Sequence, residues 1–232
     1  MNESRFSFLR QLIDSPSPSG FEQPIQQVIR EELGHYTDEI RTDVHGNVIA
    51  ALHSTTQPRV MLTAHCDEIG FLIRYIDEQG FLYFAPIGGF DTATLAADRI
   101  LIQTPNGPIT GVIGRKPIHM LHGEERNKLP DISEMWIDIG VANKEEAQKL
   151  VPLGSSVTRA AQLARLHGDL VVSKALDDRA GILPLSRQCA VFMSSKSPFR
   201  LVFFSYQRFR KRWDRVVRLR VLIVSPHLLP LP

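Results

Sequence analysis

The chain of 232 residues is 43% apolar and 22% charged, which is typical of a globular protein with one large or two small domains. Its two cysteines, Cys66 and Cys189, are too few for a disulfide framework, and the first residues lack the apolar run of a secretory signal. No stretch approaches the roughly 18 apolar residues of a transmembrane helix, so we expect a cytoplasmic protein without a membrane partner.

The net charge of +2 conceals a sharp asymmetry. Residues 182–232 contain eight Arg, two Lys and a single acid, Asp214, so this segment carries +9 and the first 181 residues carry −7. Such a break in composition indicates that the basic segment differs in origin or in role from the rest of the chain.

The first 70 residues have the pattern of an α/β domain. Apolar spacing predicts helices over 5–14 and 22–34, separated by the turn cluster S-P-S-P-S-G. The runs V-H-G-N-V-I-A-A-L at 44–52 and R-V-M-L-T-A-H at 59–65 are typical of strands, the second of a buried one.

Short alternating runs then indicate a small antiparallel β domain, with one helix predicted over 143–151. The run D-L-V-V-S at 169–173 returns to the α/β style. We therefore predict an α/β fold, a mixed sheet flanked by helices, with an inserted small β-barrel-like domain. Its expected parts are the first part of the α/β domain (1–70), the insertion (71–168), the continued α/β domain (169–181) and a basic segment (182–232).

The first chemical signal is T-A-H-C-D-E-I-G at 63–70, where the apolar strand stops. Sites of α/β proteins lie at the C-terminal ends of strands, and His65 and Asp67 project to the same side of an extended chain. A metal-binding His usually donates its other ring N–H to a carboxylate, which this pair can provide. Alone, the pattern equally fits a surface His beside solvated acids.

The second signal is S-K-A-L-D-D-R-A-G at 173–181. Its adjacent carboxylates follow an apolar strand, and a carboxylate with an imidazole suits Zn-like divalent ions. By itself this motif is as well explained by an Asp helix cap beside a solvated Asp-Arg pair.

Together, the order and context of the two signals resemble the tetrahedral, dodecameric metallo-aminopeptidases, metallopeptidase family forty-two. In that family H-x-D-E-I-G precedes an inserted β domain and K-A-L-D-D-R-x-G follows it. Further matching segments are S-G-F-E at 19–22, D-V-H-G-N at 43–47, G-V-I-G-R-K-P-I-H at 111–119, E-E-R-N-K at 124–128 and W-I-D-I-G at 136–140. The resemblance covers residues 1 to about 181 and implies a truncated, zinc-peptidase-like catalytic domain.

The resemblance implies a site with two divalent ions, Zn or Co, that removes N-terminal residues from short peptides. His65 would bind one ion, Asp177 would bridge both, and Asp67 would serve catalysis by orienting His65. In such sites a glutamate takes the proton of the attacking water. The family also implies a homo-oligomer.

The resemblance stops after Gly181. The family needs a Glu-Glu pair, a further Asp ligand and a final His ligand, yet residues 182–232 contain no Glu. Neither Asp214 in K-R-W-D-R nor His227 in S-P-H-L-L-P has a matching context, so we assign them no role. We therefore expect low metal occupancy, an inactive chain, and a basic segment that does not complete the sheet.

A change of reading frame would explain the basic segment. With ordinary codons for Arg208 to Val217, reading from the third base of the Arg208 codon gives V-Q-E-E-V-G-S-R-G, which resembles the family's glutamate motif. In the same frame Leu222 to His227 can encode A-Y-R-I-x-P. Trp213 has one codon, which restricts chance agreement. We place the change between about Gly181 and Phe203.

Two other functions fit parts of the sequence. Another dinuclear hydrolase, such as a deacylase or carboxypeptidase, could share the architecture, although A-L-D-D-R and K-P-I-H favour the aminopeptidase. A non-enzymatic fragment could instead use R-F-R-K-R-W-D-R-V-V-R-L-R, which interleaves aromatic and cationic residues as nucleic-acid-binding surfaces do. A basic run is more often a solvated segment, so we do not expect a nucleic-acid partner.

Overall fold

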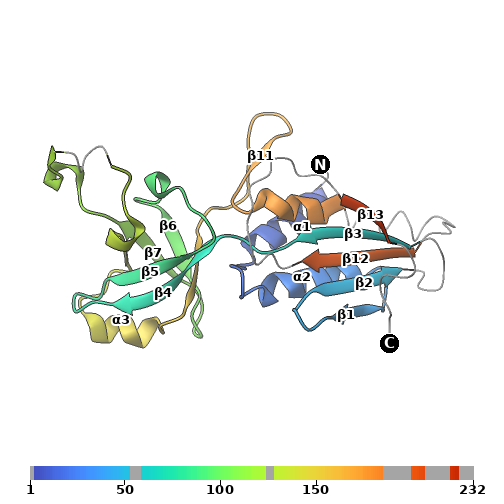
Figure 1. Cartoon of the computed structure of the whole chain (residues 1–232), viewed down its shortest axis with the longest axis horizontal. Coiled ribbons are helices and arrows are strands. Elements are labelled where there is room, and N and C mark those ends of the chain that lie inside the picture. Colours follow the sequence, from blue (N-terminus) through green and yellow to red (C-terminus); the bar gives the residue numbers. More distant parts are fainter. Residues whose placement is uncertain (1–2, 53–58, 124–127, 185–199, 207–219, 225–232) are drawn as a thin grey trace. The chain divides into compact units, whose positions relative to one another are not determined.

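The structure, a computed structural model, describes residues 3–52, 59–123, 128–184, 200–206 and 220–224 (Figure 1). The chain forms two compact units: unit 1 comprises residues 1–68 and 162–232, and unit 2 comprises residues 69–161. Unit 2 is therefore an insertion in unit 1, and it ends before residue 168, where sequence analysis placed its boundary. The stretch after residue 161 belongs to unit 1 because Leu163 packs with Phe6, Leu9 and Ile13.

Unit 1 is built on a five-stranded sheet in the order β1-β2-β12-β3-β13. Strand β12 (Arg200–Tyr206) is parallel to β3 (Arg59–His65) and antiparallel to β2 (Val48–Leu52). Strands β1 (Ile40–Thr42) and β13 (Arg220–Val224) pair in antiparallel fashion with β2 and β3. The sheet is therefore mixed.

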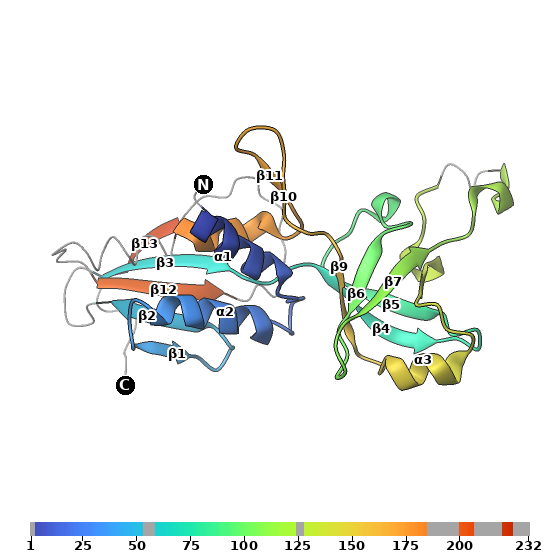
Figure 2. The same ribbon diagram turned by 180° about the vertical axis from the view of Figure 1, so that it is seen from behind.

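Two amphipathic helices, α1 (Glu3–Asp14) and α2 (Gln23–Gly34), lie on one face of this sheet (Figure 2). In α2 the buried residues Ile25, Ile29 and Leu33 recur every four positions, which places them on one stripe. That stripe joins Leu12 of α1 and side chains of β2 and β3 in one apolar core. The helices predicted over 5–14 and 22–34 are thus present.

Two predicted strands are shorter than expected. Residues 44–47 form a turn, and β2 begins only at Val48. The turn forms because the Asp43 carboxylate accepts hydrogen bonds from the backbone N–H groups of His45 and Asn47, both at 2.9 Å. The predicted strand 169–173 is reduced to β11 (Val171–Val172), which pairs with β10 (Ala164–Arg165) in a hairpin separate from the main sheet.

The expectation that residues 182–232 would not complete the sheet is wrong. β12 lies inside the sheet, and β13 occupies an edge. The run R-L-V-F-F-S-Y at 200–206 is rich in aromatic and β-branched residues, so it has strand propensity in spite of the basic charge of the segment around it. The predicted poor burial of Val191, Phe203 and Phe204 concerns side chains outside the described part of the chain, as does the basic run at 208–215.

Unit 2 is a closed six-stranded barrel in the order β4-β5-β8-β7-β6-β9. Closure leaves the barrel without an exposed edge strand. Its strands are β4 (Gly70–Ile76), β5 (Leu82–Ile87), β6 (Arg99–Ile102), β7 (Ile109–Gly114), β8 (Trp136–Asp138) and β9 (Ser156–Arg159). Asn143 caps the N-terminus of helix α3 (Lys144–Leu150), and its side chain accepts the backbone N–H of Glu146 at 3.0 Å.

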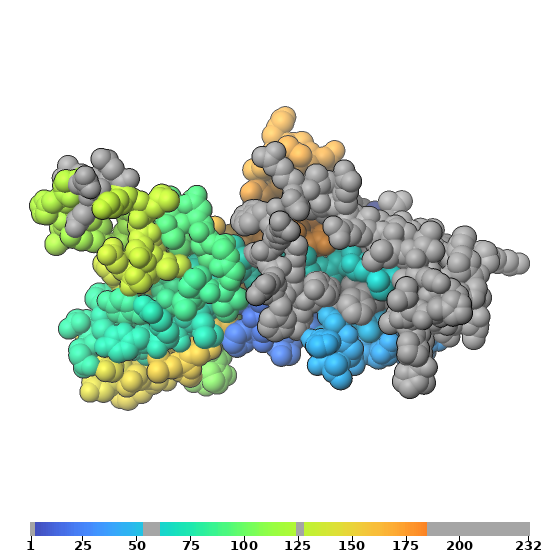
Figure 3. Space-filling view, in the orientation of Figure 1, coloured from blue at the N-terminus to red at the C-terminus, as the bar shows by residue number. Residues whose placement is uncertain are grey.

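The barrel is filled by its own apolar core, in which Phe71 and Phe84 pack edge to face. Short 3₁₀ turns at Thr92–Thr94, Ile118–Met120 and Ile132–Glu134 connect its strands. The segment after β7 exposes Ile118 and Met120, and it belongs to the yellow-green surface in Figure 3.

Candidate active site

The first site motif lies where the inner strand β3 ends. His65 is the last residue of β3 and pairs in register with Tyr206, the last residue of β12. Because β3 and β12 are parallel, their C-terminal ends reach the same edge of the sheet, which is where α/β proteins place their sites. The chain then turns away through Cys66, Asp67 and Glu68, all of which are buried.

Asp67 holds one side of the His65 ring. Its Oδ1 lies 3.0 Å from Nδ1 of His65, and its Oδ2 accepts the hydroxyl hydrogen of Ser19 at 2.5 Å. The distance to His65 is within hydrogen-bonding range. Asp67 is 4% exposed, so its charge acts on the ring with little screening by water. The arrangement predicted for His65 and Asp67 is therefore present.

Asp177 faces the other side of the same ring. Its Oδ1 lies 3.3 Å from Nε2 of His65, although a long stretch of chain separates the two residues. Residues 176–184 are helical, so Asp177 stands in the first turn, where a negative charge is favourable. The Asp177 side chain is 84% exposed, whereas that of His65 is 17% exposed. The fold thus brings both predicted metal ligands together.

The surrounding charges control the protonation of His65. Burial alone would lower the pKa of its imidazole, but hydrogen bonding to Asp67 and the charges of Asp67, Asp178 and Asp177 outweigh that effect and raise it. The pKa of the neighbouring Asp178 is raised as well. Burial and the charge of Asp177 raise the pKa of its carboxyl group, although His65 opposes this. The site therefore favours a cation between its acids.

These donors suit a divalent metal ion. An imidazole nitrogen and carboxylate oxygens form the set that borderline ions such as Zn²⁺ accept, and Oδ1 of Asp178 is buried beside them without a hydrogen-bond partner. Within the described ranges no group of three or more His, Cys, Asp and Glu side chains is arranged to hold a metal ion. His65 and Asp177 alone thus provide fewer ligands than the roughly four protein ligands of a tight zinc site.

Sequence reasoning missed the support behind this site. Ser19 belongs to the S-G-F-E segment but was given no role, and it positions Asp67. Glu68 and Arg179 belong to the two motifs themselves, and they form a buried ion pair at 2.8 Å. Both lie within two residues of a predicted site residue, which could have marked them in the sequence. Only the fold shows that Glu68 and Arg179 bind the two motifs to each other.

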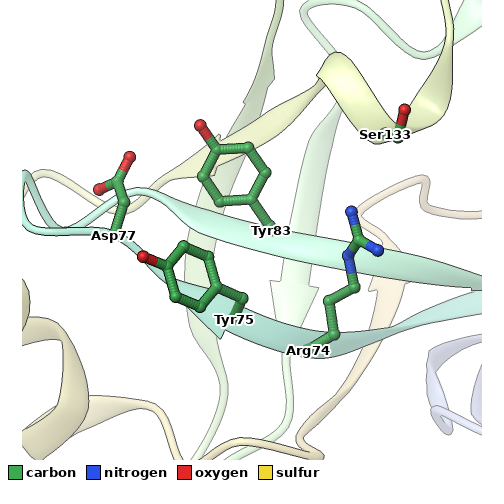
Figure 4. A pocket seen from close by; sticks show the side chains of 5 residues that line it. All are labelled: Arg74, Tyr75, Asp77, Tyr83 and Ser133. Carbon is green, nitrogen blue, oxygen red and sulfur yellow. The ribbon is translucent and has the colours of Figure 1, made fainter.

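A separate cavity of about 520 Å³ lies on the barrel unit (Figure 4). Side chains of β4 and β5 and of the turn before β8 line it, namely Arg74, Tyr75, Asp77, Tyr83 and Ser133. None of the predicted site residues contributes to it. Among the described helices, none has the length and apolar character needed to cross a membrane.

Comparison with known proteins agrees with this geometry. The sequence profile of the family described as M42 glutamyl aminopeptidase matches residues 46–205. The chain belongs to the M42 family. The proposed resemblance is thereby confirmed, and with it a family of peptidases.

The M42 match also corrects one boundary. It continues past Gly181, where we expected the resemblance to end, and reaches Ser205 in strand β12. The family pattern therefore includes a strand that we assigned to the basic segment. The match thus covers the whole interval from about 181 to 203 in which we predicted a change of frame.

Individual M42 relatives support the assignment. The SgcX protein of Escherichia coli (strain K12) is 37% identical over 177 residues, which cover 75% of this chain and 48% of SgcX. The chain thus spans about half the length of the curated relatives it matches.

Solved structures show the same fold. A TET aminopeptidase from a marine sediment Thaumarchaeota archaeon superposes with a TM-score of 0.82 at 28% identity, covering 88% of this chain and 58% of that one. The TET1 peptidase of Pyrococcus horikoshii, described as assembling into a tetrahedron or a large octahedral shell, has a TM-score of 0.78 at 29% identity over 87% of this chain and 60% of its own. The mixed α/β fold is therefore that of the tetrahedral M42 peptidases.

Proposed function

We propose that this chain carries the first half of a metal-dependent aminopeptidase site and that a change of reading frame directly after strand β12 has replaced the other half. The observation that carries this proposal is the pairing of Tyr206 with His65 at the ends of two parallel strands. The C-terminal end of β12 thus lies at the site edge of the sheet beside His65. The family's missing glutamates belong at such a place.

The sequence after β12 supports the frame change. The family match ends at Ser205, and the shifted reading of V-Q-E-E-V-G begins within the codon of Arg208. The two points lie within a few codons of each other, although they come from independent observations. In the shifted frame the two glutamates would follow β12 directly and reach the same edge as His65.

The residues that are present have defined roles in this site. Asp67 fixes the orientation of the His65 ring, which leaves Nε2 directed at Asp177. His65 and Asp177 would hold divalent metal, which supplies Lewis-acid assistance to hydrolysis of a peptide bond when it is bound. A site with these two ligands binds metal weakly compared with a four-ligand site. The chain also has no glutamate after Glu146 that could accept the water proton.

These losses should leave the chain with turnover near background. A general base typically contributes about 10²–10⁴-fold to the rate, and weak metal binding reduces it further. For the intact site, we propose N-terminal residues of short peptides as substrates, Zn or Co as the ions, a homo-oligomeric assembly and a cytoplasmic location.

The test compares this chain with a version whose frame is restored after codon 206, the last codon of β12. We expect hydrolysis of aminoacyl-p-nitroanilides with added Co²⁺ or Zn²⁺ only in the restored version, and loss of that activity on His65→Gln. Equal activity in both versions would show that the chain is not crippled. The nucleotide sequence is a second test, since codons 208–217 must encode V-Q-E-E-V-G in the shifted frame.

A further inference from the structure

Arg179 is fully buried, and its guanidinium group makes several polar contacts. Its side chain is 0% exposed. Nη1 donates to the carbonyl oxygens of Leu12 and Ile13 at 2.7 and 3.0 Å, and Nη2 donates to Glu68 at 2.8 Å. Burying a guanidinium group costs several kcal/mol unless its donors are paired, and here they are.

Glu68 joins a second cation to the same cluster. Both of its carboxylate oxygens accept hydrogen bonds from Nζ of Lys174 at 2.8 Å. The backbone N–H of Glu68 also donates to the carbonyl oxygen of Ser17 at 2.9 Å. We call Glu68, Lys174, Arg179 and Ser17 the buried charge cluster. Ser17 lies in the segment after α1 and Glu68 lies just after β3. Lys174 precedes helix 176–184, and Arg179 lies within it.

The cluster adjoins both metal-ligand candidates. Arg179 follows Asp177 by two residues on the same helix, and it also lies 3.4 Å from the carbonyl oxygen of Cys66, the residue after His65. Ser17 donates its hydroxyl hydrogen to the same carbonyl at 3.0 Å. Glu68 directly follows Asp67. Asp67 is therefore one residue from Glu68, and Asp177 is two residues from Arg179. Glu68 and Arg179 bind each other and so connect the two parts of the site.

Burying the charges of this cluster has a desolvation cost that apolar side chains would not have. A buried ion pair often contributes no net stability compared with apolar residues of similar volume, because desolvation of the charges offsets their attraction. Directional hydrogen bonds do, however, set distances between backbone segments more tightly than apolar contacts. Removing the cluster should therefore shift His65 relative to Asp177 even if it changes the free energy of unfolding only a little.

We propose that the buried charge cluster is a positioning device, in which Arg179, Glu68 and Ser17 hold the end of β3 against helix 176–184 so that His65 stands opposite Asp177. This inference rests on the proposed function, since it concerns the same metal site. The cluster contacts neither the metal nor the substrate, and it acts through the backbone of Cys66 and through the helix that bears Asp177.

The test is a titration of the full chain with Co²⁺, followed by the paramagnetic shift of the His65 ring signals in NMR spectra. His65→Gln identifies those signals. Positioning residues behind metal ligands typically change metal affinity about 10–100-fold, so we expect the dissociation constant for Co²⁺ to rise by about that factor in Arg179→Met. A smaller rise in the same direction is expected for Ser17→Ala, which retains all the charges.

The control is Arg159→Met in the barrel unit. Arg159 pairs with Asp98 at 2.6 Å, so this variant also loses a long-range ion pair. We expect its thermal unfolding midpoint to fall while its Co²⁺ dissociation constant remains that of the unmodified chain. A role in stability alone would instead leave the Co²⁺ affinity of every folded variant unchanged.

The outcomes separate the two proposals. If the His65 ring signals do not respond to Co²⁺ in the unmodified chain, the proposed metal site is wrong and the positioning role falls with it. If they respond equally in the unmodified chain, Arg179→Met and Ser17→Ala, the site stands and the positioning role is refuted. Should Arg179→Met fail to fold, Ser17→Ala and Lys174→Met decide the question by the same measurement.

Discussion

At the scale of single residues, the candidate site depends on charge placed behind a histidine. Asp67 is buried, accepts the Ser19 hydroxyl and lies against Nδ1 of His65, so it can fix the ring without itself facing solvent. Carboxylates placed behind metal-binding imidazoles have this function in other proteins. The same charge also determines how His65 titrates.

We predict that Asp67→Asn lowers the pKa of His65 in the metal-free chain. Burial favours the neutral ring, and the Asp67 carboxylate is the first of the groups that oppose burial. Without that charge the remaining acids, Asp177 and Asp178, should not fully compensate. The measurement is an NMR titration of the His65 ring. A pKa that stays the same in the variant would show that Asp67 does not control the ring.

Gly181 is a second residue on which the site depends. A Cβ atom at this position would overlap the carboxyl group of Asp178. We predict that Gly181→Ala destabilises the chain by about 1–3 kcal/mol, the range for overpacking of a buried position. Chemical denaturation measures the difference. Gly34→Ala is the matched control, because a Cβ there meets nothing within 4 Å, and it should be neutral or slightly stabilising.

At the scale of elements, short turns determine where strands begin. The turn that follows β1 is fixed by the Asp43 carboxylate, which also accepts the side-chain amide of Asn47 at 2.8 Å. Burial is the largest single effect and opposes ionisation, but the hydrogen bonds from Asn47 and His45 together outweigh it and lower the pKa of Asp43 from its ordinary value of 3.8. The folded state therefore binds the Asp43 proton less readily than the unfolded state.

This difference gives a pH dependence with a definite sign. A carboxyl group with a depressed pKa in the folded state contributes stability above its unfolded pKa, and this contribution disappears as the pH falls through its folded value. We predict that Asp43→Ala is less stable than the unmodified chain at pH 6 and that the gap narrows as the pH drops below 3.8. Urea denaturation of both chains over this range is the measurement. A gap independent of pH would contradict the prediction.

At the scale of the whole molecule, the described residues of each unit form apolar cores of their own. The barrel core includes Phe71, Ile100 and Ile137 and draws on no residue outside unit 2. The first and last strands of unit 2 are neighbours in the barrel, because β4 pairs with β9. A closed barrel with its own core satisfies the requirements for an independent domain.

We therefore predict that residues 69–161 fold when they are expressed alone. The fragment should show one cooperative thermal transition and dispersed NMR signals. Ile137→Ala should destabilise it by about 2–5 kcal/mol, the usual cost of removing a large buried side chain. Val112→Ala, at a position that is 40% exposed, is the control and should have little effect. A fragment without a cooperative transition would show that the barrel needs unit 1.

Local patterns in the sequence were sufficient for several features. The apolar periodicity of residues 5–14 and 22–34 predicts α1 and α2, and the alternation after Gly70 predicts the strands of the barrel. The motifs around His65 and Asp177 indicate the family, because each motif is a continuous run of residues that the sequence alone displays. Each of these signals lies within a few turns of helix or one strand.

Tertiary structure decided what depends on distant partners. The strand at 200–206 has the residues of a buried strand, but its basic surroundings concealed this, and only pairing with β2 and β3 shows that it completes the sheet. Likewise, Arg179 has the sequence context of a solvated Asp-Arg pair and yet is fully buried against Glu68. A charge can be buried only where its partners converge, and that convergence is a property of the fold rather than of any local stretch of sequence.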